Sequence, residues 1–240
     1  MNTLEAIKLC IRVEYINNDT SPLEYFKDVE TDAEMCLLQK PTYNVIIFKS
    51  TDSKRDWEIN KMFLPTRDAD GDIYHSGFYK QYRTLHDKVI EWADKNKHLY
   101  LIGHSLGGAL AEICSIHLFK DYPNVSVKTF GAPRAVISSS KVHVDSESYF
   151  LENDIVAMVP PPPYRHLSYS KIVLSKTGES KAGKFRNYNT TLFQKFLYYL
   201  NRVNYIRLLI AYFKKKNDDN HSSQNYKKAI EKLKFLKIRL

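Results

Sequence analysis

Cysteine is scarce in this 240-residue chain, whose three cysteines are Cys10, Cys36 and Cys114. Their number is odd and their spacings match no metal-binding motif, which argues against a disulfide framework and against a zinc site. A reducing compartment is the simplest explanation of this composition.

Long apolar runs are also missing. No stretch of about 18 or more apolar residues is free of charge, so nothing predicts a membrane-spanning helix. Residues 1–15 contain Glu5, Lys8 and Arg12 and lack the apolar segment of a secretion signal. We therefore expect an intracellular, cytoplasmic protein, with peripheral contact as its only membrane role.

Acidic residues are fewer than basic ones. The chain has 27 Asp and Glu and 36 Lys and Arg, so its net charge is +9. A basic surface suits an anionic membrane or nucleic acid, and it is equally typical of a solvated lysine-rich surface. No zinc-finger spacing or RNA-binding aromatic motif accompanies the charge, so we expect no nucleic-acid partner. The length favours a single domain over residues 1–240, and nothing in the sequence indicates the oligomeric state.

Short apolar segments of two kinds alternate along the chain. Strand-like segments occur at residues 34–39, 44–49, 98–102, 125–130 and 148–151. Helical spacing of apolar residues occurs at 3–16, 77–95, 106–120 and 226–240. Residues 50–76 are polar, and we expect them to be irregular. This order predicts an α/β fold in which helices flank a mostly parallel sheet.

The sharpest motif is Gly-His-Ser-Leu-Gly at residues 103–107, between a predicted strand and a predicted helix. A G-x-S-x-G sequence in that setting is typical of a nucleophile elbow, which holds its serine on a strained turn. Ser105 is the candidate nucleophile. The amide of Leu106, at the start of the helix, can donate to a developing oxyanion. A glycine-rich turn with an incidental serine is the alternative.

A serine nucleophile of this kind needs an acid and then a histidine further along the chain. Asp154 follows the strand at 148–151 and is the best candidate acid, with Asp145 and Glu152 as rivals. Two histidines come after Asp154, namely His166 and His221. Position alone does not choose between them.

Several segments together resemble the class 3 lipases, an α/β-hydrolase family. They are VIIFKST at 45–51, HSGFY at 75–79, IGHSLGGALA at 102–111, TFGAPR at 129–134 and NDIVAMVPP at 153–161. The segment NHSSQNYKKAI at 220–230 is similar to the part of the family that bears the catalytic histidine, with a tyrosine a few residues later. The resemblance therefore implies that His221 is the base and that His166 is structural.

The resemblance also implies an oxyanion hole formed by the amides of Thr51 and Leu106. The family usually has Arg-Gly at the end of the oxyanion strand, where this chain has Lys49 and Ser50. Glycine permits backbone torsions that serine tolerates poorly, so the hole is expected to be weaker or rearranged.

Two segments are candidates for contact with lipid. Residues 52–66 resemble the family's lid in position, and Trp57, Met62 and Phe63 are their lid candidates. Residues 190–216 predict a helical insertion that is basic and aromatic, which suits an anionic membrane surface. Packing against the core is the alternative for both segments.

We expect a serine carboxylester hydrolase that acts on lipid esters, similar to a triacylglycerol lipase. Its residues would be Ser105, Asp154 and His221, with no cofactor and no metal. The alternatives are a phospholipase or esterase acting on other esters, and a catalytically weak membrane-binding protein. The expected partners are the lipid ester substrate and an anionic membrane.

Overall fold

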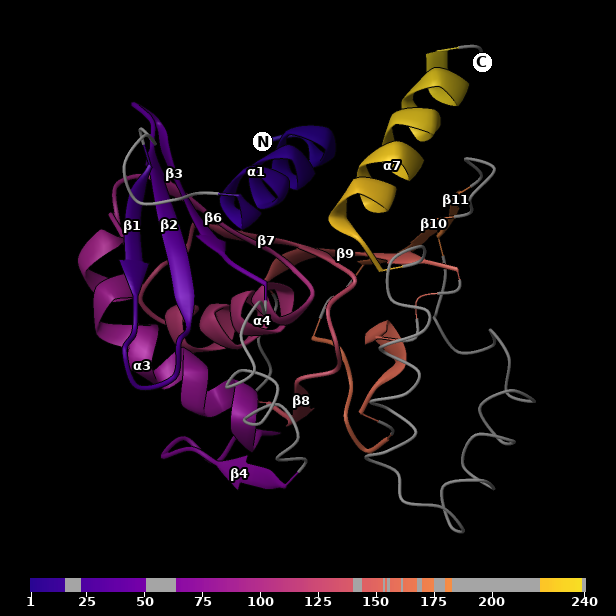
Figure 1. Ribbon diagram of the computed structural model, residues 1–240. Coiled ribbons are helices and arrows are strands. Elements are labelled where there is room, and N and C mark those ends of the chain that lie inside the picture. The colour runs from indigo at the N-terminus through magenta and orange to yellow at the C-terminus, as the bar shows by residue number, and fades with distance from the viewer. Residues whose placement is uncertain are drawn as a thin grey trace, which may run out of the picture.

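The structure, a computed structural model, describes residues 1–15, 23–50, 64–139, 144–152, 154, 156–160, 162–167, 170–174, 180–182 and 221–238 (Figure 1). Side chains are described for these residues except 170–171, 180–182 and 233–238. The helical insertion expected at 190–216 lies outside the described residues.

An eight-stranded sheet forms the centre of the described fold, in the order β1-β2-β3-β6-β7-β9-β10-β11. These strands span Glu24–Lys27, Glu34–Gln39, Tyr43–Phe48, His98–His104, Val125–Phe130, Asp145–Leu151, Ser170–Leu174 and Ser180–Ala182. Strands β3, β6, β7, β9 and β10 pair in parallel, whereas β1, β2 and β11 form antiparallel edges. The predicted α/β class with a mostly parallel sheet is confirmed.

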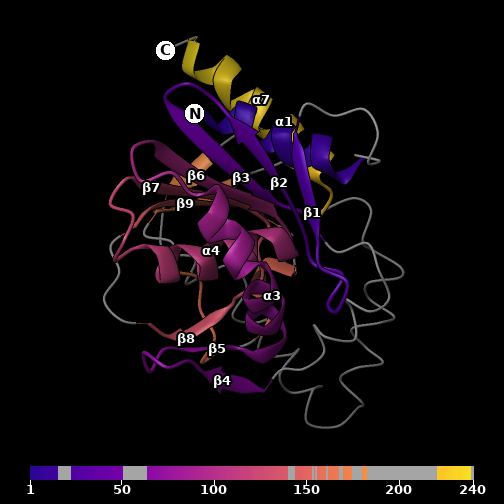
Figure 2. The same ribbon diagram turned by 90° about the vertical axis from the view of Figure 1, so that its left-hand side faces the viewer.

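Helices cover both faces of this sheet (Figure 2). The α3–α4 face carries α3 (Ser76–Trp92) and α4 (Leu106–Leu118), and the α1–α7 face carries α1 (Thr3–Glu14) and α7 (Ser223–Ile238). Strand β3 serves both faces because successive side chains of a strand point in opposite directions. Ile46 packs in the cluster under α3 and α4, and Ile47 packs in the cluster under α1 and α7.

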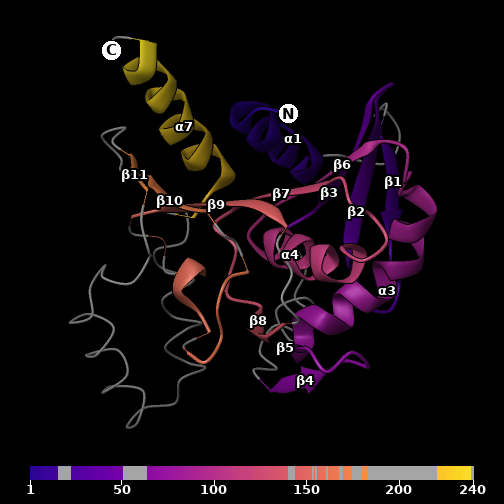
Figure 3. The ribbon, with the colours of Figure 1, turned by 180° about the vertical axis from the view of Figure 1, so that it is seen from behind.

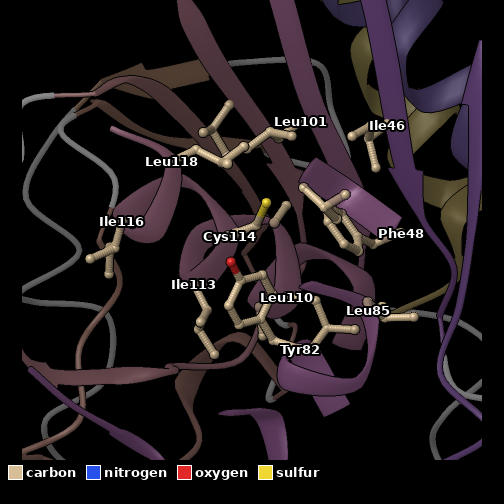
Figure 4. Packing of buried hydrophobic residues seen from close by; sticks show 14 of the residues in the cluster. Ile46, Phe48, Tyr82, Leu85, Leu101, Leu110, Ile113, Cys114, Ile116 and Leu118 are labelled. Atoms are coloured by element: carbon tan, nitrogen blue, oxygen red, sulfur yellow. The ribbon is translucent and has the colours of Figure 1, made fainter. Parts of the chain in front are cut away.

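Helix α4 is buried almost all round, which matches its small and apolar composition. Leu110 and Cys114 of α4 lie in the same buried cluster as Tyr82 of α3 and Phe48 of β3 (Figure 4). This packing fixes the start of α4, and therefore the turn before it, against the middle of the sheet.

A second, three-stranded sheet contains β4 (Pro65–Arg67), β5 (Ile73–His75) and β8 (Val136–Ser138). The expectation that residues 50–76 are irregular is therefore wrong for 65–67 and 73–75. These strands are too short to show an alternating pattern, and β5 pairs with a strand that is distant in the sequence.

Candidate active site

Ser105 occupies the turn between β6 and α4, with φ 53° and ψ −127°. Such a backbone is strained by about 1–3 kcal/mol for a residue other than glycine. The flanking glycines make the turn possible. A Cβ at Gly103 would lie 2.2 Å from the carbonyl carbon of Gly107, and a Cβ at Gly107 would lie 2.1 Å from the Phe48 carbonyl oxygen.

A continuous line of contacts joins Ser105 to a histidine and an aspartate. His221 Nε2 lies 2.7 Å from Ser105 Oγ, and His221 Nδ1 lies 2.8 Å from Asp154 Oδ2. Asp154 is fully buried in the loop after β9, and His221 precedes α7. From behind, the start of α7 lies beside β9, which brings the histidine to the strand ends (Figure 3). The arrangement can pass a proton from the serine hydroxyl to a histidine that a carboxylate orients.

Both oxygens of Asp154 accept hydrogen bonds from other groups. Val156 donates its backbone N–H to Oδ1 over 2.9 Å, and the Tyr226 hydroxyl donates to Oδ2 over 2.6 Å. The same hydroxyl accepts the backbone N–H of Leu151 over 3.0 Å. Burial, the charge of Asp154 and the hydrogen bond to it raise the pKa of Tyr226, so its phenol stays protonated as a donor.

Gly131 directly follows β7 and lies against the Asp154 and Tyr226 side chains, with a positive φ of 60°. A Cβ at this position would lie 2.7 Å from Asp154 Oδ2, 2.9 Å from the Tyr226 hydroxyl and 3.1 Å from His221 Cε1. The TFGAPR motif gives no sign by itself that Gly131 leaves room for the acid. The resemblance pointed to a tyrosine after the histidine, but the sequence does not indicate that Tyr226 donates to Asp154.

The rival residues lie elsewhere. Asp145, at the start of β9, accepts from the Ser126 hydroxyl over 2.9 Å, whereas Asp154 follows the other end of that strand. His166 is buried with Nε2 2.9 Å from the Ala157 carbonyl oxygen, and its ring packs against Phe150. Glu152 begins the turn after β9 and is not brought to His221 by any contact among the described residues.

The oxyanion-hole candidates are described only in part. Leu106 begins α4 directly after Ser105, so its amide is at a helix N-terminus, as expected. Ser50 is not one of the non-glycine residues with positive φ, which within the described chain are Asp32 and Ser105. Thr51 and the lid candidates Trp57, Met62 and Phe63 lie outside the described residues.

Metal ligands do not gather in the described part of the chain, where no group of three or more His, Cys, Asp or Glu side chains could hold an ion. The acidic loop at 68–72 is instead a turn in which Asp68 accepts the backbone N–H of Asp72 over 2.8 Å. Ser105, His221 and Asp154 bring a hydroxyl, an imidazole and a carboxylate together in the site.

The family described as Lipase (class 3) matches residues 45–164, which is half of the chain. The chain belongs to the class 3 lipase family. The matched range includes Ser105 and Asp154 and ends before His221.

The relatives of this class 3 lipase include fungal enzymes. It is 28% identical over 99 residues to secreted mono- and diacylglycerol lipase A of Penicillium camembertii, covering 38% of this chain and 32% of that protein. It is 27% identical over 140 residues to a lipase of Rhizomucor miehei, covering 51% of this chain and 39% of that protein. The chain therefore spans about a third of the length of the curated relatives it matches.

Solved structures of lipases share the fold. A fungal lipase–inhibitor complex superposes with a TM-score of 0.56 at 21% identity, covering 71% of this chain and 76% of that one. A triacylglycerol lipase described as having a serine protease triad at its catalytic centre superposes with a TM-score of 0.52 at 22% identity. The match covers 67% of this chain and 69% of that one. At these identities the likeness establishes the α/β-hydrolase fold.

The predicted intracellular, cytoplasmic location is wrong by this comparison, because matching relatives from two Penicillium species are secreted enzymes. The prediction rested on the lack of a secretion signal in residues 1–15, on the lack of a long apolar run and on the scarce, odd-numbered cysteines. All three are buried and unpaired, and burial raises the pKa of each thiol, that of Cys36 to about 12. Buried thiols of this kind carry no information about the redox compartment. Among the described residues, no helix is both long enough and apolar enough to cross a membrane.

Proposed function

We propose that the chain is a serine carboxylester hydrolase that acts on lipid esters through an acyl-enzyme. The observation that carries the proposal is the line of contacts from Ser105 through His221 to Asp154, with distances of 2.7 and 2.8 Å. A serine on a strained elbow, bonded to an oriented imidazole, is the arrangement that acyl transfer requires.

In the first half of the reaction, Ser105 Oγ attacks the ester carbonyl carbon while its proton passes to His221 Nε2. The carbonyl electrons move to oxygen, and the amides of Leu106 and Thr51 would stabilise this oxyanion. Collapse of the intermediate breaks the bond to the alcohol, which leaves with the proton from His221. The acyl group remains on Ser105.

Water completes the reaction by the same route. His221 takes a proton from the water, whose oxygen attacks the acyl carbon, and then returns a proton to Ser105 Oγ as the fatty acid leaves. Asp154 holds the imidazole in the required orientation and stabilises the imidazolium in both halves. Tyr226 and Val156 occupy the oxygens of Asp154 throughout, which fixes the carboxylate.

The lipid class of the substrate rests on the relatives, which are named as mono- and diacylglycerol lipase and as triacylglycerol lipase. We also propose peripheral contact with anionic membranes, supported by the net charge of +9 and by the three consecutive lysines at 214–216. Co-sedimentation with anionic and neutral vesicles at low and high salt tests this contact. Equal absence of binding to both would overturn it.

Active-site labelling tests the proposed function directly. A fluorophosphonate should label the wild-type chain and leave Ser105→Ala unlabelled, although every other serine is still present. A panel of monomeric esters, acylglycerols and phospholipids then separates a lipase from an esterase or a phospholipase. A wild-type chain that binds vesicles yet neither labels nor hydrolyses any ester would contradict the proposal.

A further inference from the structure

Glu14 is placed where helix formation alone would not put a carboxylate. It is the last residue of α1, and the side chain is only 17% exposed. The negative end of the helix dipole lies at this terminus, so an acidic residue is unfavourable there unless it has partners. Glu14 also lies outside the part of the chain that the family matches.

The two oxygens of Glu14 contact two different segments of the site. Oε1 lies 3.1 Å from His104 Nδ1, a contact that attracts the ring when Nδ1 carries a proton. Oε2 accepts a hydrogen bond of 2.6 Å from the hydroxyl of Ser223, the first residue of α7. Glu14 therefore ties the end of α1 to the end of β6 and to the start of α7.

His104 carries this link to the candidate base. It directly precedes Ser105, and its Nε2 donates to the backbone carbonyl oxygen of His221 over 2.7 Å, because a carbonyl can only accept. The His104 and His221 rings lie 4.9 Å apart between centroids. His221 is thus held through its backbone from one side, while Tyr226 anchors the same segment to Asp154 from the other.

The charge of Glu14 fits this role. Burial acts to raise its pKa, but the contacts with His104 and Ser223 and the nearby His221 outweigh burial, so that the pKa lies below its usual value. The groups that face Glu14 are Cys10 on its own helix and these three residues. When His104 carries protons on both ring nitrogens, an ionised Glu14 attracts Nδ1 while Nε2 donates to the His221 carbonyl, and the ring is held in place.

We propose that Glu14 is a positioning residue for the base, acting through His104 and Ser223 on the backbone at His221. The inference rests on the proposed hydrolase function. Its effect is to keep His221 Nε2 within hydrogen-bond distance of Ser105 Oγ, since a displacement of about 1 Å can cost on the order of a hundredfold in rate. Helix α1 would then help to position His221, although none of its residues contacts the substrate.

Variants at Glu14 test the first contact. Glu14→Ala removes both interactions, while Glu14→Gln keeps an acceptor for Ser223 and removes the charge beside His104. We expect kcat to fall about tenfold in Glu14→Ala and less in Glu14→Gln, with KM unchanged. Glu5→Gln is the matched control, because it removes the same charge from the same helix roughly 13 Å away along the axis. It should behave as wild type.

A pair of variants at His104 tests the second contact. The amide nitrogen of His104→Gln can take the place of Nε2 and donate to the His221 carbonyl, whereas that of His104→Asn can only take the place of Nδ1. We expect His104→Gln to retain several-fold more activity than His104→Asn. Equal activity of the two variants would overturn the route through the His221 backbone.

Rates are expressed per active site, counted by fluorophosphonate titration, so that partial unfolding does not imitate a loss of kcat. Unchanged kcat per labelled site in Glu14→Ala would overturn the inference and leave the proposed function intact. If the wild type neither labels nor hydrolyses, the proposed function fails instead. Thermal unfolding of Glu14→Ala, His104→Asn and the double variant then decides the link: a non-additivity of about 2–4 °C supports it, and additivity overturns it.

Discussion

The two faces of the central sheet are built from different parts of the chain. The α3–α4 face comes from consecutive elements between residues 76 and 118, all within the range that the family matches. The α1–α7 face brings together the two ends of the described chain, Thr3–Glu14 and Ser223–Ile238, and both lie outside that range. The first face positions the serine, and the second supplies the histidine and its supports. The candidate site thus depends on joining a locally encoded half to a half assembled from distant segments.

The largest expected effect comes from breaking either half of the site at its reactive group. Ser105→Ala and His221→Ala should each lower kcat by about 10⁴-fold or more, and the double variant should be little worse, because such residues act as a unit. His166→Ala is the control and should lower stability more than activity. Ester hydrolysis and thermal unfolding are measured for each. An active His221→Ala together with a folded, inactive His166→Ala would reverse the assignment.

The second-largest effect is expected for Gly131→Ala, which disturbs the packing of Asp154, Tyr226 and His221. The added Cβ would meet Asp154 Oδ2 at 2.7 Å, so kcat should fall about a hundredfold. Gly71→Ala is the matched control, since Gly71 also has a positive φ of 90° but faces only the Arg67 side chain at 3.8 Å. Both variants should lose stability from backbone strain, and Gly71→Ala should keep its rate per active site. Equal rates in the two variants would show that strain, and not the contact, matters.

A smaller effect is expected for Tyr226→Phe, which removes the hydroxyl between Asp154 and Leu151. We expect kcat to fall about tenfold and stability by about 1–3 kcal/mol, because the buried N–H of Leu151 loses its acceptor. Tyr149→Phe is the control, because Tyr149 packs in the same hydrophobic cluster as Tyr226. Its hydroxyl contacts Thr3 and Glu147 and does not reach the acid. A Tyr149→Phe variant that loses as much kcat as Tyr226→Phe would contradict a specific role for Tyr226.

The two faces also differ in the response of their stability to acid, which has the smallest expected effect on kcat. Burial lowers the pKa of His75, at the start of α3, from 6.5 to about 4. The unfolded chain therefore takes up this proton first as pH falls. The stabilisation is complete above pH 6.5 and is lost between pH 6.5 and about 4, by up to about 3 kcal/mol. The lowered pKa of Glu14 on the other face adds a loss only at lower pH.

Denaturant unfolding at several pH values measures this dependence. His75→Asn keeps a side chain that can cap α3 and cannot be protonated, so its stability should change less between pH 7 and 4.5. The same slope in wild type and His75→Asn would show that His75 is not the group responsible.

The limits of sequence reasoning follow the same division between the faces. The elbow is encoded within a few residues, because the glycines at 103 and 107 are needed by contacts with each other and with the neighbouring strand. Asp154 follows from its place after a strand. The choice between His166 and His221 needed the family resemblance, since 116 residues separate Ser105 from His221 and no spacing rule spans that distance.

The sequence by itself determined the α/β class, the nucleophile candidate and the acid candidate, because strand, turn and helix signals are local properties of the backbone. Only the tertiary structure decided that His221 meets Ser105, that Gly131 leaves room for the acid and that Glu14 reaches His104. These contacts join segments far apart in the chain. Their geometry is set by how two helices pack on one face of a sheet, which residue spacing does not encode.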